Sequence, residues 1–301
     1  MMPVRRSGTL TLVTLALIWG SSFLWIKIAL RGIPPVHITA MRLVLGAVVL
    51  VGYARFRRAA LPRGGALWRH LFVAALFANV VPYLLFAYGE QEVDSAVAGV
   101  LNATTPLWTV LIAVVVGLER RPGARKAVGL LLGFAGAVLI FEPWRSGSEP
   151  MSAGGVACLA AAASYAVSYV YMTRFLAGTG PTPLALSAGQ LTAASALSCA
   201  ALPFAGWRDV VPRPDAVGAL VVLGVLGTGI AYVLNYRLIR DGGASSAAVV
   251  TYLIPVVAVI LGVLTLGETL PPPVIVGMVV VLLGVALARS DDRRGAVPGG
   301  A

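Results

Sequence analysis

Charged residues are scarce in this chain of 301 residues. Only 12% of its residues are Asp, Glu, Lys or Arg, whereas 58% are apolar, and the mean hydropathy is +0.89. Soluble globular domains carry about 25% charged residues. This composition therefore excludes an ordinary soluble domain and predicts an integral membrane protein whose main partner is the lipid bilayer.

The residues from which catalytic and metal sites are built are also few. The two cysteines, Cys158 and Cys199, lie within apolar runs without metal-ligand spacing, and the two histidines, His37 and His70, are far apart. The chain has no phosphate-binding loop, no HExxH motif and no paired acids. We therefore expect no enzyme, no metal and no cofactor.

Acidic residues are absent from the middle of every apolar run. The nearest ones are Glu90, Glu92, Asp94, Glu119 and Glu268, all at run ends. Because proton-coupled carriers commonly use an acid at membrane depth, the sequence offers no obvious proton carrier. The formal net charge of +11 lies mostly in short loops, which favours contact with anionic lipid rather than with nucleic acid.

Ten apolar runs are long enough to cross a bilayer, for which a helix needs roughly 17–25 residues. The predicted fold is all-α, with spans at 9–29, 35–53, 67–87, 96–117, 125–141, 152–173, 184–204, 216–237, 244–266 and 272–288. The fifth and tenth are the shortest. The natural boundary between two halves is the polar segment 142–151.

Lysine and arginine distribute unevenly between the two sides that these spans define. With the N-terminus inside, 17 of the 23 basic residues fall on the inner side, 5 on the outer side, and Arg42 within the second span. The positive-inside rule therefore predicts a multi-pass protein of the cell (inner or plasma) membrane with both termini cytoplasmic.

Two long segments are related by a shift of 149 residues. Residues 82–122 align without gaps on 231–271, so that Tyr83 falls on Tyr232, Pro106 on Pro255, Glu119 on Glu268 and Pro122 on Pro271. An internal repeat of this kind determines the fold. It predicts two five-helix units, 9–141 and 152–288.

Five helices per unit is an odd number, so the second unit enters the membrane from the opposite side. Fainter matches support the pairing: residues 35–42 align on 183–190 with a shift of 148, and Gly129 and Gly136 align on Gly277 and Gly284. Inverted repeats are typical of secondary transporters, whose substrate site lies near the midplane between the repeats.

Two prolines are expected to kink the helices that hold them. Pro106 and Pro255 each free a backbone carbonyl about one turn earlier, those of Asn102 and Thr251. Such carbonyls are tolerated where they line a cavity or meet a polar side chain. Asn102 and Thr251 are thus cavity candidates, and a packing kink with a locally satisfied backbone is the alternative.

Aromatic residues form a second group of candidates. Tyr165 and Tyr169 are one turn apart on one helix face, and Tyr83 and Tyr232 are repeat mates; with Trp19 they surround the predicted centre. Their rings are suited to stacking on a substrate or binding an amine through cation–π contact. The alternative is a belt at the membrane interface.

The expected roles of the charged residues near or within the spans follow from their positions. Arg42 lies deep in the second span, where a cation costs at least about 3 kcal/mol. Its guanidinium either binds a substrate carboxylate or phosphate, or has a structural role. In the structural role it reaches the membrane surface by snorkelling or donates to a freed backbone carbonyl. Lys27 is expected to snorkel. Glu119 and Glu268 are expected to cap the helix that follows each, or to pair with loop arginines.

Small residues line the fifth span, at Gly129, Gly133 and Gly136. Such a face lets helices approach closely. We expect it to pack within the bundle, with a homodimer contact as the alternative.

Taken together, the motif WGSSF (19–23), the P-x6-R pattern (35–42) and the duplicated proline and glutamate endings resemble the EamA family of the drug/metabolite transporter superfamily. The resemblance covers the whole chain as two units, except that Tyr165 stands where the family has a tryptophan. It implies a ten-helix carrier, often an exporter of amino acids or other small metabolites. The alternatives are a lipid-linked sugar flippase of the same superfamily and a structural or sensory subunit with a dry core.

Overall fold

The computed structural model describes residues 6–118, 123–141, 152–205 and 210–289, and throughout these ranges the regular structure is helical. The first half holds α1 Arg6–Gly20, α2 Ser22–Ala29, α3 Pro35–Phe56, α4 Gly65–Ala75, η1 Leu76–Val80, α5 Val81–Gly89, α6 Ser95–Asn102, α7 Thr105–Val115 and α8 Ala124–Phe141. The second holds α9 Ala153–Phe175, α10 Pro183–Ala205, α11 Pro214–Val221, η2 Val222–Ile230, α12 Ala231–Leu266 and α13 Pro272–Arg289.

These helices occupy all ten predicted places, and the fold is the predicted bundle of two inverted five-helix repeats. Seven helical stretches of the described chain are long and apolar enough to cross a membrane, and Leu253–Leu266 and Pro272–Leu287 are shorter apolar helices. The fifth and tenth helices, α8 and α13, have 18 residues each. Their shared shortness was expected from the repeat.

Several spans are interrupted rather than straight. The first span breaks at Ser21, whose hydroxyl donates to the Ile18 carbonyl at 3.0 Å. The fourth breaks between Asn102 and Thr105, just before Pro106. Both breaks lie at residues that the sequence analysis singled out, one in the WGSSF motif and one at the first repeated proline.

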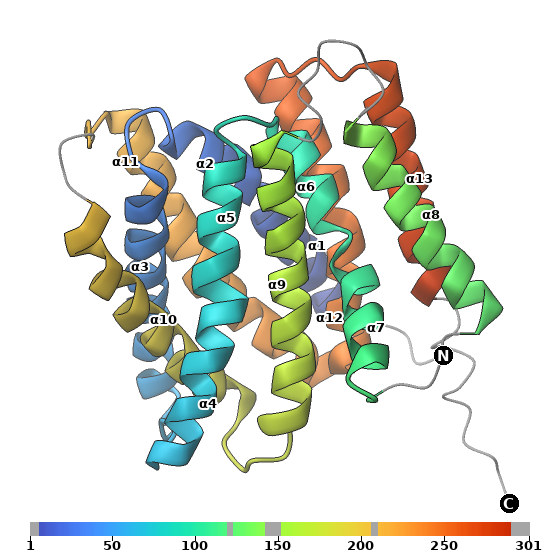
Figure 1. Ribbon diagram of the computed structural model, residues 1–301. Helices are drawn as coiled ribbons and strands as arrows, with labels where there is room; N and C mark the ends of the chain where they lie inside the picture. Colours follow the sequence, from blue (N-terminus) through green and yellow to red (C-terminus); the bar gives the residue numbers. More distant parts are fainter. Residues whose placement is uncertain (1–5, 119–122, 142–151, 206–209, 290–301) are drawn as a thin grey trace, which may run out of the picture.

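The expected loop between the eighth and ninth spans is replaced by continuous helix, because α12 runs from Ala231 to Leu266. This helix is not a straight rod. Gly227, just before it, lies against Ser22, and Val257, within it, lies against Gly20. Thirty helical residues would extend about 45 Å, so the chain reverses direction between these two contacts, as Figure 1 shows.

We call the end of the bundle that holds the α2–α3 and α5–α6 turns and the start of α9 the distal end, at the top of Figure 1. The other end, which holds the start of α1, is the proximal end. The sequence analysis places the distal end outside the cell.

Glycines bring α8 and α13 into close antiparallel contact. A Cβ on Gly136 would lie 2.8 Å from the Gly277 carbonyl oxygen, and one on Gly284 would lie 2.8 Å from the Gly129 carbonyl oxygen. These two contacts are related by the repeat, since Gly129 and Gly136 match Gly277 and Gly284. The small-residue face is thus used within the chain, where Figure 1 shows the two helices side by side.

This packing predicts a position-dependent effect of adding one methyl group. Gly284→Ala is expected to destabilise the protein by about 1–3 kcal/mol, because the methyl group would meet backbone atoms that cannot move aside. Gly52→Ala on α3, where nothing lies within 4 Å, is the control and should be neutral or stabilising by roughly 0.5–1 kcal/mol. Thermal unfolding in detergent measures both, and equal midpoints would contradict the close approach.

Candidate functional site

Arg42 on α3, a buried cation within the second span, is held by groups from both repeats. Its side chain is buried, and its Nε donates to the Thr228 hydroxyl on η2 at 3.0 Å. Its guanidinium lies 4.0 Å from the centre of the Tyr83 ring on α5. A hydroxyl from the second repeat and an aromatic face from the first thus stabilise a cation that lipid would exclude.

A second polar link crosses the repeat interface beside the first. The side-chain amide of Gln190 on α10 donates to the side-chain oxygen (Oδ1) of Asn79 at 2.7 Å. The side-chain nitrogen of Asn79 donates in turn to the Tyr232 hydroxyl at 2.9 Å. Asn79 and Gln190 are buried, so these bonds satisfy amides that would otherwise be costly.

The two links are copies of each other under the repeat. Gln190 is the mate of Arg42 at a shift of 148, and Thr228 is the mate of Asn79 at a shift of 149. Each bond joins a second-helix residue of one repeat to a residue of the other repeat's third helix. We call these six residues the central cluster: Arg42, Asn79, Tyr83, Gln190, Thr228 and Tyr232.

Widened helical turns position the cluster in both repeats. The segments η1 and η2 are π-helical, with Val81 N–H donating to the Leu76 carbonyl and Ala231 N–H to the Leu226 carbonyl. The Thr228 hydroxyl also donates to the Leu223 carbonyl at 3.0 Å. A cluster tyrosine follows within three residues of the end of each widened turn, and such turns are frequent at functional sites.

Small residues let η2 approach α3 closely enough for the Arg42–Thr228 bond. A Cβ on Gly46 would lie 2.8 Å from the Thr228 Cβ. A Cβ on Gly227 would lie 3.4 Å from the Ser22 hydroxyl and 3.9 Å from an Arg42 guanidinium nitrogen. A larger residue at position 46 would collide with Thr228 and push the guanidinium and the hydroxyl apart, whereas the contacts at Gly227 are ordinary van der Waals distances.

Further aromatic rings continue from the cluster along α9 and α5. Tyr165 stacks on Tyr169 with ring centres 6.5 Å apart, and Phe86 lies 6.3 Å from Tyr165. Tyr165 packs against the same buried residues as Tyr232. The rings of Tyr165, Tyr169 and Phe86 therefore extend the aromatic surface beside the cluster.

Comparison with known proteins now identifies the lineage of this fold and cluster. The profile described as "EamA-like transporter family" matches residues 6–142 and 152–290. The chain belongs to the EamA-like transporter family.

The relatives of this EamA-like transporter span nearly its whole length. It is 29% identical to the "Uncharacterized inner membrane transporter YedA" of Escherichia coli strain K12, in an alignment that covers 86% of this chain and 83% of that protein. It is 30% identical to an "Uncharacterized transporter" of Archaeoglobus fulgidus, in an alignment that covers 95% of this chain and 98% of that protein. A solved crystal structure covering 97% of this chain has a TM-score of 0.67 at 24% identity, which supports the fold alone.

Five of the eight cavity candidates lie in or beside the central cluster of this EamA-like protein: Arg42, Tyr83, Tyr165, Tyr169 and Tyr232. Trp19 packs with Tyr165 against the apolar core that includes Phe23 and Phe86. Asn102 and Thr251 are partly buried on α6 and α12. Their substrate contacts stay predictions.

Local bonds satisfy the backbone freed by the first proline. The Thr105 hydroxyl donates to the Asn102 carbonyl at 2.7 Å, and the Thr104 hydroxyl donates to the Leu101 carbonyl. Pro106 thus accompanies a break in the helix whose carbonyls are met by threonines. Pro255, the equivalent residue of the second repeat, lies inside α12 without interrupting the helix.

Three members of the cluster were not among the predicted candidates: Asn79, Gln190 and Thr228. Gln190 had been noted only as the mate of Arg42. Asn79 lies three residues before the aligned stretch that begins at Pro82, and extending that alignment would have paired it with Thr228. Polar residues at equivalent places in both repeats were the missed signal.

Charged groups at the distal end differ from their expected roles. Lys27 donates to the backbone carbonyls of Glu90 and Val93 at 2.7 and 2.8 Å, instead of only snorkelling. Glu268 accepts from the Ser95 and Ala96 N–H groups at 2.8 and 3.0 Å. It therefore caps α6 of the other repeat and not the following α13, whose first two residues are prolines without N–H groups. Glu119 lies outside the described residues.

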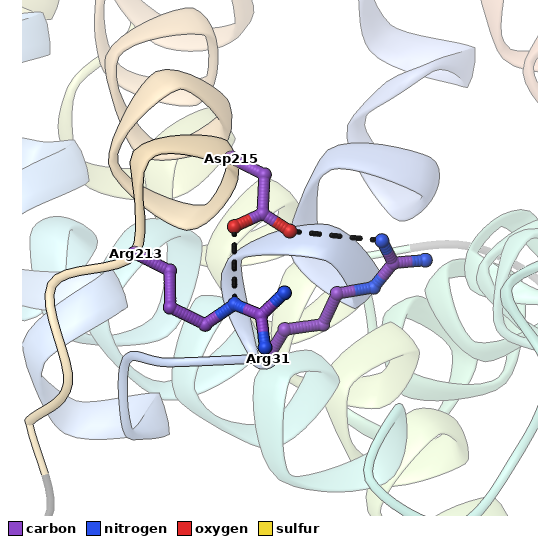
Figure 2. Close-up of polar contacts among 3 residues, drawn as sticks. All are labelled: Arg31, Arg213 and Asp215. Atoms are coloured by element: carbon purple, nitrogen blue, oxygen red, sulfur yellow. Dashed lines mark hydrogen bonds and ion pairs between the residues drawn. The ribbon is translucent and has the colours of Figure 1, made fainter.

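Other contacts join the repeats at the same end. Glu92 accepts from the Gly154 N–H at 2.6 Å, and Val211 N–H donates to the Gly32 carbonyl at 2.8 Å. Figure 2 shows Asp215 between Arg31 of the first repeat, at 3.7 Å, and its neighbour Arg213, at 3.2 Å. This exposed ion pair contributes little, whereas the hydrogen bonds of Glu268 and Glu92 to backbone N–H groups join the two repeats at the distal end.

Two surface pockets accompany this arrangement, and the central cluster lines neither. One of about 430 Å³ lies at the distal end among Lys27, Arg31, Asp94 and Leu266–Thr269. The other, of about 490 Å³, lies between α3, α5 and α10 and includes His37, Tyr88 and Phe204. Phe204 is 91% exposed, so the second pocket opens on an apolar face.

Proposed function

We propose that this EamA-like transporter carries a small metabolite out of the cell, such as an amino acid or an amphipathic amine. The single observation that carries the proposal is Arg42, a buried cation beside an aromatic face at the interface of the repeats. A guanidinium binds a carboxylate in a fixed geometry, and tyrosine rings attract an ammonium group. The pair suits a zwitterion.

Transport would proceed by alternating access, in which the units 9–141 and 152–288 rock around the central cluster. Each polar link in the cluster joins one repeat to the other, so relative movement of the repeats would change the site. The distal end would face the outside and both termini the cytoplasm, which follows the distribution of Lys and Arg.

Uptake into liposomes tests this proposal. Purified protein is reconstituted and offered a panel of amino acids, amines and other metabolites. We expect transport of at least one class, together with a ligand-induced increase in the unfolding temperature. A folded protein that gives neither result across the panel would refute the carrier and favour a structural or sensory subunit.

The repeat predicts equal effects from two tyrosine replacements. Tyr83→Ala and Tyr232→Ala should each reduce transport by about tenfold or more, since a lost aromatic–cation contact is worth about 1–2 kcal/mol in a desolvated site. Tyr88→Ala is the control, because Tyr88 lies on the same helix as Tyr83 but is 45% exposed. Normal transport by both cluster variants would remove the central site from the mechanism.

A lipid-linked sugar flippase is the second candidate, and the pocket between α3, α5 and α10 favours it. That pocket opens beside exposed Phe204 and Tyr88, where a lipid chain would have access from the bilayer. In that case Tyr88→Ala would impair transport, and labelled lipid-linked sugar would move between leaflets of the liposomes.

A further inference from the structure

Glu90 is a carboxylic acid that is enclosed by the fold at the distal end. It follows the last residue of α5 and is 1% exposed. Neither of its carboxylate oxygens has a hydrogen-bond partner among the described residues. Buried carboxylates are normally paired or hydrogen-bonded, so this one requires an explanation.

The nearest cation is directed at the backbone and not at the Glu90 side chain. The Lys27 ammonium on α2 donates to the carbonyls of Glu90 and Val93. The other groups that face Glu90 are Arg42 on α3, Glu268 after α12 and the Cys158 thiol on α9. Two cations therefore lie in range, but the Glu268 carboxylate opposes them.

Burial decides the balance among these influences. Removal from water raises the pKa of Glu90 well above its ordinary value, and the Glu268 carboxylate raises it further, while Lys27 and Arg42 lower it. Desolvation is the largest of the four because the side chain has lost its hydration without gaining a donor. The raised pKa and the absence of a donor to either carboxylate oxygen both favour the neutral acid in this conformation.

The same enclosure depends on contacts between the two repeats. Glu268 of the second repeat accepts from N–H groups at the start of α6, and Glu92 of the first repeat accepts from the start of α9. Separating the repeats at the distal end would break these contacts. Water would then reach the turn that carries Glu90.

We propose that Glu90 is a proton-binding site, which holds a proton while the distal end is closed and releases it to water when that end opens. The reaction is the protonation of one carboxylate by solvent and its reversal. No other group in the site changes its covalent state.

The direction of the pH dependence follows from this assignment. The carboxyl has a raised pKa in the closed form and an ordinary one, about 4.3, in the open form. Closing therefore takes up a proton between these two pKa values. Within that window the ratio of closed to open protein falls about tenfold for each unit of rising pH, and the advantage of the closed form is complete only at lower pH.

Glu90 also interacts electrostatically with Arg42, which links the proton to the central cluster. If the proposed function holds, a substrate carboxylate at Arg42 would favour proton binding, and a cationic substrate would favour proton release. Carboxylate substrates would then travel with a proton and amines against one.

Infrared absorption tests proton binding without any substrate. At neutral pH the wild-type protein should show the carbonyl band of a protonated carboxylic acid, and Glu90→Gln should lose it. Asp215→Asn is the control, because Asp215 is an acid at the same end whose contacts with Arg31 and Arg213 are exposed, and this variant should keep the band. A wild-type spectrum without a band that depends on Glu90 would overturn the proposal even if transport is observed.

A distance measurement tests the link to opening. Spin labels are attached at Gln91 and Thr269, two exposed positions of the two repeats, in protein lacking the exposed Cys199. The wild type should shift to longer distances as the pH rises, and Glu90→Gln should stay closed at every pH. Unchanged pH dependence in Glu90→Gln would overturn the link, whether or not the protein transports the metabolite panel.

Discussion

Replacing Arg42 by glutamine is expected to weaken substrate binding and transport strongly while leaving a folded protein. Gln190 already occupies the equivalent place in the other repeat, where it donates to Asn79 at 2.7 Å. A glutamine at position 42 is therefore sterically and chemically acceptable to the bundle. The charge is what disappears. Hydrogen bonds to charged groups contribute about 1.5–3 kcal/mol, so substrate affinity should fall by roughly 10- to 150-fold, as measured by binding and uptake.

A charge exchange provides the control for Arg42. The double variant Arg42→Gln with Gln190→Arg moves the guanidinium to the repeat-equivalent position beside Asn79 and Tyr232. Because the two links are copies, this protein should recover part of the lost affinity. Wild-type affinity in the single variant would mean that the cation serves the structure alone.

Replacing Glu268 by alanine is expected to open the distal end. The carboxylate accepts hydrogen bonds from two N–H groups at the start of α6, and α6 belongs to the other repeat. Loss of a helix cap of this kind costs about 0.5–2 kcal/mol. The ratio of open to closed protein should therefore increase roughly 2- to 30-fold, measured with labels at Gln91 and Thr269.

Asp215→Asn is the control for the distal end. Asp215 is also an acid that joins the repeats there, but its contacts with Arg31 and Arg213 are exposed (Figure 2). Exposed pairs are typically worth less than 1 kcal/mol, so this variant should resemble the wild type. If Glu268→Ala leaves the distances unchanged, its two bonds do not keep the repeats together.

The architecture could be predicted from the sequence because the internal repeat is visible in the alignment of the two halves. The shift of 149 residues paired Tyr83 with Tyr232, and an odd number of spans per unit required the second copy to be inverted. The continuous helix across the eighth and ninth spans was not accessible. Residues 241–243, Asp-Gly-Gly, favour a loop between the two spans, yet the helix continues through them, and the position of the reversal depends on packing against α1.

The central site was predicted in part. Arg42 was identified because a cation at membrane depth needs a partner, but its partners, Thr228 and the Tyr83 ring, depend on how closely η2 approaches α3. The widened turns that set this approach leave little mark on the sequence. Pro82 follows η1, yet Ala231 stands in the equivalent place after η2.

The role of Glu268 illustrates a signal that was present but not used. A glutamate three residues before a proline was expected to cap the helix that follows. Prolines fill positions 271–273, so the first turn of α13 offers almost no N–H groups to accept. The carboxylate instead meets the exposed N–H groups of α6, a helix that is remote in sequence.

Arg42 and Gln190 occupy equivalent positions in the two repeats but differ in charge, and this difference has an energetic consequence for the transport cycle. In a carrier whose two repeats were identical, the inward- and outward-open states would be mirror versions of one conformation and would have the same energy. Here one repeat contributes a charge and the other an amide, so that degeneracy is lifted. The empty protein should rest mainly on one side of the membrane, and a ligand's charge determines how far it moves that balance.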